Sequence, residues 1–265
     1  MAELNNRLLV ASDIGEFNTV QFLIQNGTNV NVSNENGFTA LHYAVSGKHF
    51  DIVRLLLEGG ANVNQCDESA WTPFHIAAQN GSDNIIRLLM QHGADINFGT
   101  NNGVRPLNSA ARNGHVDIVQ ILLTSGVDVN SRANDGRIAL HSVAQTGHTD
   151  VVRLLIQNGA DINARMDDGW TSLHCAASNG HLEIIQLLLR GGANINETSA
   201  DGWTPLYGAA WRGHIDAVRY LVESGAHVNQ SNRNGSTPLH IAAERDYNDI
   251  VTFLLENGAN DVANF

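Results

Sequence analysis

The sequence predicts an all-α solenoid of about eight helix-turn-helix repeats with projecting β-turn or hairpin loops. The first observation is a constant period of about 33 residues, and the others are Thr and Pro at the expected helix starts and Gly at the helix ends. Because one unit of this length cannot bury a core, stability must come from stacked neighbours in an elongated, curved array. The period is marked by a small residue at the start of each motif: Gly37, Ala70, Gly103, Gly136, Gly169, Gly202 and Gly235.

The period predicts one domain, residues 1–265, without an internal linker. The first and last repeats are atypical and carry many polar residues, so we expect them to act as caps that complete the stack. The repeats fall at about 1–33, 34–66, 67–99, 100–132, 133–165, 166–198, 199–231 and 232–265.

The first helix of each repeat begins at a recognisable pair of positions. Thr39, Thr72, Thr171, Thr204 and Thr237 occupy the N-cap position. All four prolines follow one residue after the cap position, where a missing N–H costs nothing.

The second helix has apolar residues at a spacing of three to four, as in Ile52, Val53, Leu56 and Leu57, which predicts one buried face. Glycines that recur once in every repeat, from Gly27 to Gly258, end these helices. Three pairs of opposite charge at a spacing of three are expected on the exposed side: Asp51 with Arg54, Asp150 with Arg153, and Asp216 with Arg219.

The motif that opens each repeat identifies a family. It reads GFTALHYAV from Gly37, AWTPFHIAA from Ala70 and GWTPLYGAA from Gly202. These motifs resemble the T-P-L-H-x-A signature of ankyrin repeats, and the resemblance covers almost the whole chain. It implies a non-catalytic interaction module or scaffold, which binds a protein partner on its concave face and turn tips.

Composition narrows the class of partner. The net charge is −12 and the pI about 5.3, which disfavours nucleic acid and anionic membranes. We expect a protein partner that is basic or of mixed charge, and a monomeric chain. No long apolar run or secretion signal is present, and Cys66 and Cys175 lie too far apart for a disulfide. These observations predict a soluble protein of the cytoplasm or nucleus.

Twelve histidines suggest a metal site or acid–base chemistry, but ten of them fall in two repeat positions. The resemblance implies that the motif histidine, as in His42, joins loops of neighbouring repeats through hydrogen bonds. No zinc-binding spacing, C-x-x-C, phosphate-binding loop or G-x-S-x-G motif occurs. We therefore predict no catalytic residue, metal or cofactor.

Function is expected where the repeat pattern is broken. In the fourth and fifth repeats Arg105 and Ile138 replace the capping Thr, and Asn108 replaces the motif His. These changes predict a locally less stable middle of the stack, with drift of the repeat as the alternative explanation. Arg112 and Arg137 add positive charge there and are candidate partner contacts.

The seventh repeat departs furthest. Tyr207 replaces the motif His, Gly208 follows it, and Trp211 lies one helical turn later in a position that is polar in the other repeats. Trp, Tyr and Arg dominate binding energy at many interfaces. We predict a partner site at Trp170, Trp203, Tyr207, Trp211 and Arg212, with cover by the chain itself as the alternative for Trp211.

Acidic turn residues rim this site. Asp167, Asp168 and Asp201 occupy turn tips, which contact partners in the family that the sequence resembles. The other explanation is turn chemistry, because Asp favours such turns.

Two further hypotheses remain open from the sequence. A small-ligand binder or atypical enzyme would use an aromatic groove around Trp203, Tyr207 and Trp211, with space beside Gly208. A designed scaffold is disfavoured by the irregular substitutions, the two cysteines and the variable caps.

Overall fold

The computed structural model describes residues 2–260 and confirms the predicted all-α class. Met1 and residues 261–265, at the outer ends of the predicted first and last repeats, lie outside the described part. Sixteen helices form within it, as eight consecutive pairs. Their bounds are α1 Ala2–Ile14, α2 Phe17–Gln25, α3 Ala40–Ser46, α4 Phe50–Glu58, α5 Pro73–Asn80, α6 Asp83–Gln91, α7 Pro106–Arg112, α8 Val116–Thr124, α9 Ala139–Thr146, α10 Thr149–Gln157, α11 Ser172–Ser178, α12 Leu182–Arg190, α13 Pro205–Arg212, α14 Ile215–Glu223, α15 Pro238–Glu244 and α16 Asn248–Glu256.

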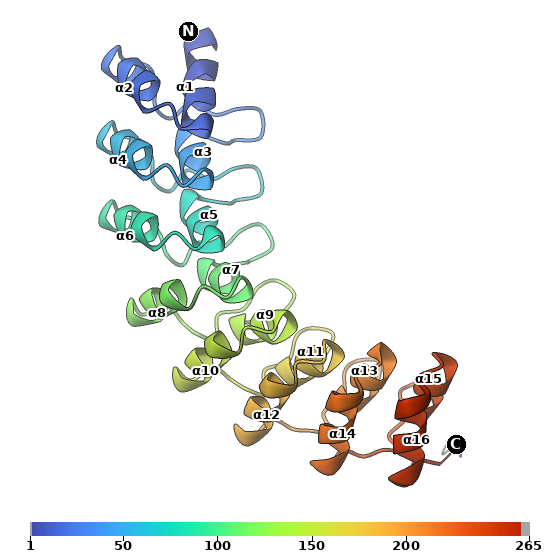
Figure 1. Ribbon diagram of the computed structural model, residues 1–265. Coiled ribbons are helices and arrows are strands. Elements are labelled where there is room, and N and C mark those ends of the chain that lie inside the picture. The colour runs from blue at the N-terminus through green and yellow to red at the C-terminus, as the bar shows by residue number, and fades with distance from the viewer. Residues whose placement is uncertain (1, 261–265) are drawn as a thin grey trace. The chain divides into compact units, whose positions relative to one another are not determined.

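The helices fall into two compact units, Met1–Asp128 and Val129–Phe265. In the first unit α1, α3, α5 and α7 pack in one layer, while α2, α4, α6 and α8 pack in a second (Figure 1). The second unit repeats this plan, with α9, α11, α13 and α15 in one layer and α10, α12, α14 and α16 in the other (Figure 1). Each unit therefore has an inner-helix layer, formed by the odd-numbered helices, and an outer-helix layer.

The inner helices begin as predicted, because Thr and the motif His cap them together. In α3, Thr39 Oγ1 accepts a hydrogen bond from His42 N at 3.4 Å, and Thr39 N donates to His42 Nδ1 at 3.1 Å. His42 Nε2 then lies 3.2 Å from the carbonyl oxygen of Trp71 in the next repeat. One side chain thus both begins a helix and joins two repeats, which confirms the role expected for this histidine.

Half of this arrangement survives where Thr is replaced. Arg105 N donates to Asn108 Oδ1 at 3.0 Å, and Ile138 N donates to His141 Nδ1 at 3.1 Å. Asn108 therefore supplies the same acceptor as the histidine that it replaces. Ile138 has no side-chain acceptor for the second hydrogen bond, so a local loss of stability stays a prediction.

A second link between repeats comes from the Asn that precedes each loop. Asn31 Nδ2 donates to the carbonyl of Gly60 at 3.2 Å, and Asn31 Oδ1 accepts from Asn62 N at 2.7 Å. The same two-way bridge recurs at Asn64, Asn130, Asn163 and Asn229. These side chains satisfy backbone groups that short helices leave without partners.

The outer helices bury the predicted apolar face, and Ile52, Val53, Leu56 and Leu57 of α4 are all buried. Only one of the three expected charge pairs forms, between Asp51 and Arg54. The other two predictions were wrong because a neighbouring helix offers a better partner. Arg153 binds Glu183 of α12, and Arg219 stacks over the ring of Phe253 at 4.5 Å.

One turn is strained in a way that can be relieved. Ala70 has φ 62° at a position where Gly37, Gly103 and the other repeats have glycine with positive φ. A side chain in the left-handed region costs roughly 1–2 kcal/mol, partly offset by the lower chain entropy of Ala in the unfolded state. We expect Ala70→Gly to raise the free energy of unfolding by about 0.5–1 kcal/mol, measured by urea titration with circular dichroism. Gly103→Ala should lower it, and a less stable Ala70→Gly variant would refute the assignment of strain.

Candidate functional site

Trp203 is the centre of an aromatic cluster in the seventh repeat. Its ring centroid lies 4.9 Å from Tyr207, 5.1 Å from Trp211 and 6.3 Å from Trp170. The cluster arises because Trp203 directly precedes the N-cap of α13, whereas Tyr207 and Trp211 lie one turn apart on that helix. The structure therefore brings together all four aromatic residues that the sequence singled out.

Tyr207 is the buried member of this cluster. Its side chain is only 4% exposed, and its hydroxyl donates to Ser236 Oγ at 3.4 Å. The three tryptophans are half-buried and keep part of their surface in solvent. Tyr207 thus holds Trp203 in place, and the tryptophans form the accessible part of the predicted site.

Two arginines stack on Trp211. The guanidinium carbon of Arg212 lies 4.2 Å from the ring centroid, and that of Arg245 lies 4.9 Å from it. Both arginines are exposed and lie at the C-terminal ends of α13 and α15, where the helix dipole favours positive charge. Sequence reasoning missed Arg245, although its position, one full repeat after Arg212, was a usable signal. We call Trp170, Trp203, Trp211, Arg212 and Arg245 the aromatic–arginine surface.

The space expected beside Gly208 is filled. A Cβ atom built on Gly208 would lie 2.3 Å from Ser178 Oγ of the preceding inner helix, α11. Ser178 is itself buried, and so is Cys175 one turn before it. The prediction of an open space at Gly208 was therefore wrong, because the neighbouring repeat occupies it.

The acidic turn residues lie along a backbone ladder that joins successive turns. Asp167 N donates to the Asp135 carbonyl at 3.0 Å, Ala200 N to that of Asp168 at 2.7 Å, and Arg233 N to that of Asp201 at 3.0 Å. Asp168 also accepts from Trp170 N at 3.0 Å. The side chains of Asp167, Asp168 and Asp201 remain exposed, so turn chemistry accounts for part of their role and leaves negative charge at the tips.

The two arginines predicted in the middle repeats have different surroundings. Arg137 is half-buried, where its Nε lies 3.3 Å from Asp135 Oδ2 and its Nη1 donates to Gln145 at 2.9 Å. Arg112 is exposed in the last turn of α7. They belong to different units, and their role as partner contacts stays a prediction.

Burial keeps three titratable groups of the second unit neutral at neutral pH. The pKa of His141 and that of His174 are each lowered to about 4, because burial disfavours the charged imidazolium. Burial also raises the pKa of the Cys175 thiol to about 12. His174 Nε2 bonds the Trp203 carbonyl at 2.9 Å and is used structurally. At neutral pH both histidines are therefore neutral but only weakly basic, and the Cys175 thiol stays protonated, which is not the nucleophilic form.

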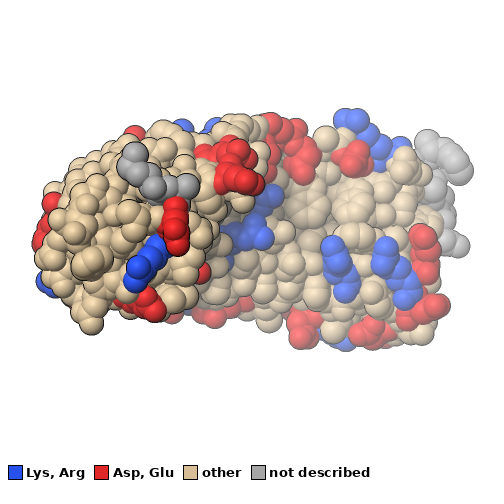
Figure 2. Space-filling view, turned by 90° about the horizontal axis from the view of Figure 1, so that it is seen from above, with Lys and Arg blue, Asp and Glu red and all other residues tan. Residues whose placement is uncertain are grey.

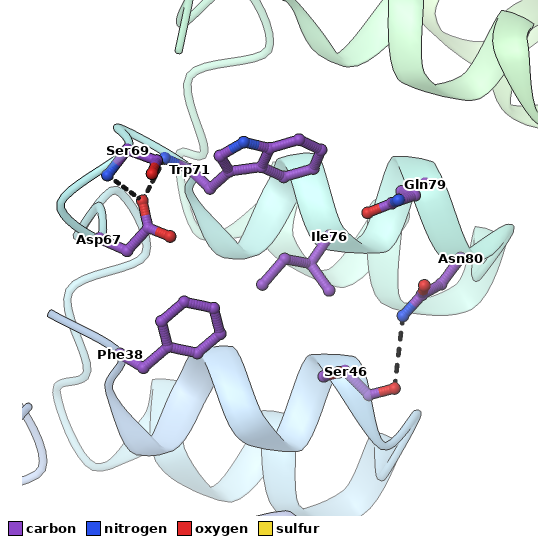
Figure 3. Close-up of a pocket in the computed structure, with 8 residues that line it drawn as sticks. All are labelled: Phe38, Ser46, Asp67, Ser69, Trp71, Ile76, Gln79 and Asn80. Carbon is purple, nitrogen blue, oxygen red and sulfur yellow. Dashed lines mark hydrogen bonds between the residues drawn. The ribbon is translucent and has the colours of Figure 1, made fainter. Parts of the chain in front are cut away.

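A groove in the first unit was not anticipated from the sequence. It lies between α3 and α5, has a volume of about 340 Å³, and is drawn in Figure 3. Phe38 and Trp71 occupy a position that is also aromatic at Trp170 and Trp203, so they do not depart from the repeat pattern. The lining residues are Phe38, Ser46, Asp67, Ser69, Trp71, Ile76, Gln79 and Asn80.

Residues 2–260 contain neither a recognisable metal site nor a helix that could span a membrane. No cluster of three or more His, Cys, Asp or Glu that could hold a metal ion occurs in that range. None of the helices in this part of the chain has the length and apolar character needed to cross a bilayer. Figure 2 shows one face of the molecule, on which uncharged residues cover broad areas between separate groups of charged side chains.

Comparison with known protein families gives matches that together extend over residues 8–264. A family model described as ankyrin repeats, in three copies, matches four overlapping stretches, residues 8–100, 59–133, 107–199 and 177–264. A search among curated proteins gave no match.

Proposed function

Because this chain belongs to the ankyrin-repeat family, whose repeats generally mediate protein–protein interaction, we propose that it is a non-catalytic interaction module. The inner-helix layer and the turn tips of its second unit bind a protein partner. The aromatic–arginine surface forms the centre of the contact, and Asp167, Asp168 and Asp201 form its rim.

The observation that carries this proposal is Trp211. Its position is occupied by Ser46, Gln79, Arg112, Gln145, Ser178 and Glu244 in the other repeats, so the scaffold needs no aromatic there. Two exposed arginines stack on the ring, and Trp203 also contacts it. A preorganised group of Trp and Arg loses little side-chain entropy on binding, which suits it to anchor a partner.

The charges around the surface favour a partner of mixed charge. Arg212 and Arg245 stand at the C-terminal ends of their inner helices, whereas Asp167, Asp168 and Asp201 stand at the turn tips that precede inner helices. An apolar segment with a basic residue toward the tips and an acidic residue toward the arginines would match both edges. The small-ligand alternative loses the space on which it depended, since Ser178 fills it.

The test is capture of cellular proteins by the immobilised chain, compared among variants by quantitative mass spectrometry. We expect Trp211→Ala to reduce capture of the specific partner at least tenfold, the loss typical of a central interface residue. Phe22→Ala, which removes an exposed aromatic from the outer helix α2, serves as the control and should capture normally.

Stability must be measured in parallel, because Trp211 also packs within the chain. Removing its contacts is expected to cost about 1 kcal/mol and to leave the protein folded. Equal capture by the parent and a folded Trp211→Ala variant would refute the site. Persistent capture by Arg212→Gln, with loss only in Trp211→Ala, would remove the arginine from the proposal.

A further inference from the structure

We propose that the groove between α3 and α5 is a second binding site, which takes the basic side chain, Lys or Arg, of a peptide segment. It lies in the first unit and shares no residue with the aromatic–arginine surface. Three features favour a basic side chain. They are two aromatic walls, one carboxylate with an oxygen that accepts no hydrogen bond among the described residues, and neighbouring turns that contain no Lys or Arg.

The walls are Trp71 and Phe38. Figure 3 shows Trp71 above the groove and Phe38 below it, with Ile76 between them. Each ring is held by its own repeat, since Trp71 contacts His75 with centroids 5.5 Å apart and Phe38 contacts His42 at 5.1 Å. Within the described residues no ring contact joins Phe38 to Trp71. The faces of these rings and the apolar Ile76 suit the stem and charged head of a long basic side chain.

Asp67 supplies the carboxylate at the tip end of the groove. Its Oδ1 accepts both turn hydrogen bonds, from Ser69 N at 2.9 Å and from Trp71 N at 2.7 Å. Among the described residues no hydrogen bond is made to Oδ2. One oxygen therefore completes the turn, and the other remains available to a ligand.

The turn itself does not require a negative charge. Asn34 Oδ1 and Asn232 Oδ1 make the same pair of turn hydrogen bonds in their own repeats. Thr100 and Ser199 make one of the two bonds with a hydroxyl. Asp67 is the only charged residue at this position of the repeat, which is otherwise Asn34, Thr100, Ala133, Met166, Ser199 and Asn232. Its charge is an addition to the scaffold.

The surrounding charges reinforce the preference for a cation. Glu35 and Glu68 are exposed in the same two turns, residues 34–39 and 67–72, and these turns contain no Lys or Arg. The backbones of the turns are joined by a hydrogen bond from Glu68 N to the Asn36 carbonyl at 3.1 Å. A positive side chain entering here meets aromatic faces and a carboxylate without displacing an existing ion pair.

The opposite end of the groove is polar and suits the backbone of the bound segment. Asn80 Nδ2 donates to the Ser46 carbonyl at 3.3 Å, and Gln79 lies beside it on α5 (Figure 3). Lys48, the nearest cation of that end in sequence, donates to the Asn80 carbonyl at 2.8 Å. The groove thus has an acidic end and an amide-rich end, which gives the bound segment a direction.

The experiment is a titration of the full chain with short peptides, followed by the Trp71 indole N–H signal in NMR. The probes are acetyl-Gly-Arg-Gly-amide and acetyl-Gly-citrulline-Gly-amide, which have nearly the same shape and differ in charge. We expect the arginine peptide to shift the signal at millimolar concentration and the citrulline peptide to bind about tenfold more weakly. Equal binding of the two, or no shift with either, would overturn the proposal.

Matched variants locate the effect. Asp67→Asn keeps the turn, as Asn34 does, and should abolish the tenfold preference for arginine. Phe38→Val, with the residue that Val104 places at the equivalent position, should weaken binding of the arginine peptide about fivefold. Phe22→Ala, on the outer helix α2, should change neither. An unchanged preference in a folded Asp67→Asn variant would refute the role of the carboxylate.

This test is separate from that of the proposed function. Variants in the groove leave Trp211 and its arginines intact, so the capture experiment can fail while the peptide titration succeeds, or the reverse. A partner that uses both sites would show a reduced capture in Asp67→Asn as well as in Trp211→Ala.

Discussion

Lowering the pH from 6.5 to 4 is expected to destabilise the protein strongly. The pKa of His141 and of His174 is about 4 in the folded chain, against 6.5 for an unperturbed histidine. Burial is the main cause, and the pKa values of His42 and His75 are lowered by the same cause. In this window the unfolded chain binds more protons than the folded chain, so acid favours unfolding.

The sign and size follow from linkage. Because the folded pKa is depressed, the stabilisation is fully present above pH 6.5 and is lost progressively as the pH falls toward 4. Each pKa unit corresponds to 1.36 kcal/mol, so His141 and His174 each account for roughly 3 kcal/mol over the window. Urea titrations with circular dichroism at pH 7.5, 6.5, 5.5, 4.5 and 4.0 measure the loss.

Asn108 provides the control for this prediction. It occupies the motif position in α7 and accepts the N-cap hydrogen bond without titrating. The double variant His141→Asn with His174→Asn should be less stable at pH 7.5, because the bonds to the Ala164 and Trp203 carbonyls are lost. Its stability should depend less on pH, by roughly 1.4 kcal/mol per pH unit for each histidine removed. An unchanged slope would show that other groups cause the acid sensitivity.

The second large effect is expected for Phe74→Ala. Phe74 is completely buried in α5 and replaces the leucine that every other full repeat has at this position. Truncation removes a whole ring from a packed interface between inner helices, which costs about 3–5 kcal/mol. Chemical denaturation measures this value.

Two substitutions calibrate that result. Phe74→Leu restores the residue found at the equivalent position of other repeats and should cost about 1 kcal/mol, since most of the buried volume is retained. Phe22→Ala removes a ring that is 58% exposed and should change stability by less than about 0.5 kcal/mol. A Phe74→Ala variant whose stability nearly equals that of the parent would contradict the packing described.

Most of the fold could be predicted from the sequence because its determinants are local. Thr39 with His42, proline after the cap, and glycine at the helix end act within a few residues, and each recurs at a fixed period. The wrong predictions involve contacts between repeats. Arg153 and Arg219 contact residues of a neighbouring outer helix, which the spacing of residues within one helix cannot predict.

The candidate site divides in the same way. Departures from the repeat led to Trp203, Tyr207 and Trp211, whose proximity follows from the geometry of one helix. Arg245 lies in the repeat after Trp211, and Ser178 lies in the repeat before Gly208. The contact of Arg245 with Trp211, and the filling of the space beside Gly208 by Ser178, therefore depend on how the repeats stack. The groove at Trp71 could not be predicted from the sequence because Phe38 and Trp71 follow the repeat pattern. Only the groove that forms between two stacked repeats marks them as a possible binding site.

The asparagine bridges join residues that are separated by only about one repeat along the sequence. Asn31 reaches Gly60 and Asn62, which lie 29 and 31 residues along the chain, and the other bridges span the same separations. In the part of the chain that the structure describes, these bridges join only adjacent repeats. A chain whose links all join adjacent repeats can nucleate at any neighbouring pair and grow by adding one repeat at a time. We therefore expect folding of each unit to propagate from repeat to repeat, so that a defect at one bridge slows growth past that point and leaves the repeats already formed intact.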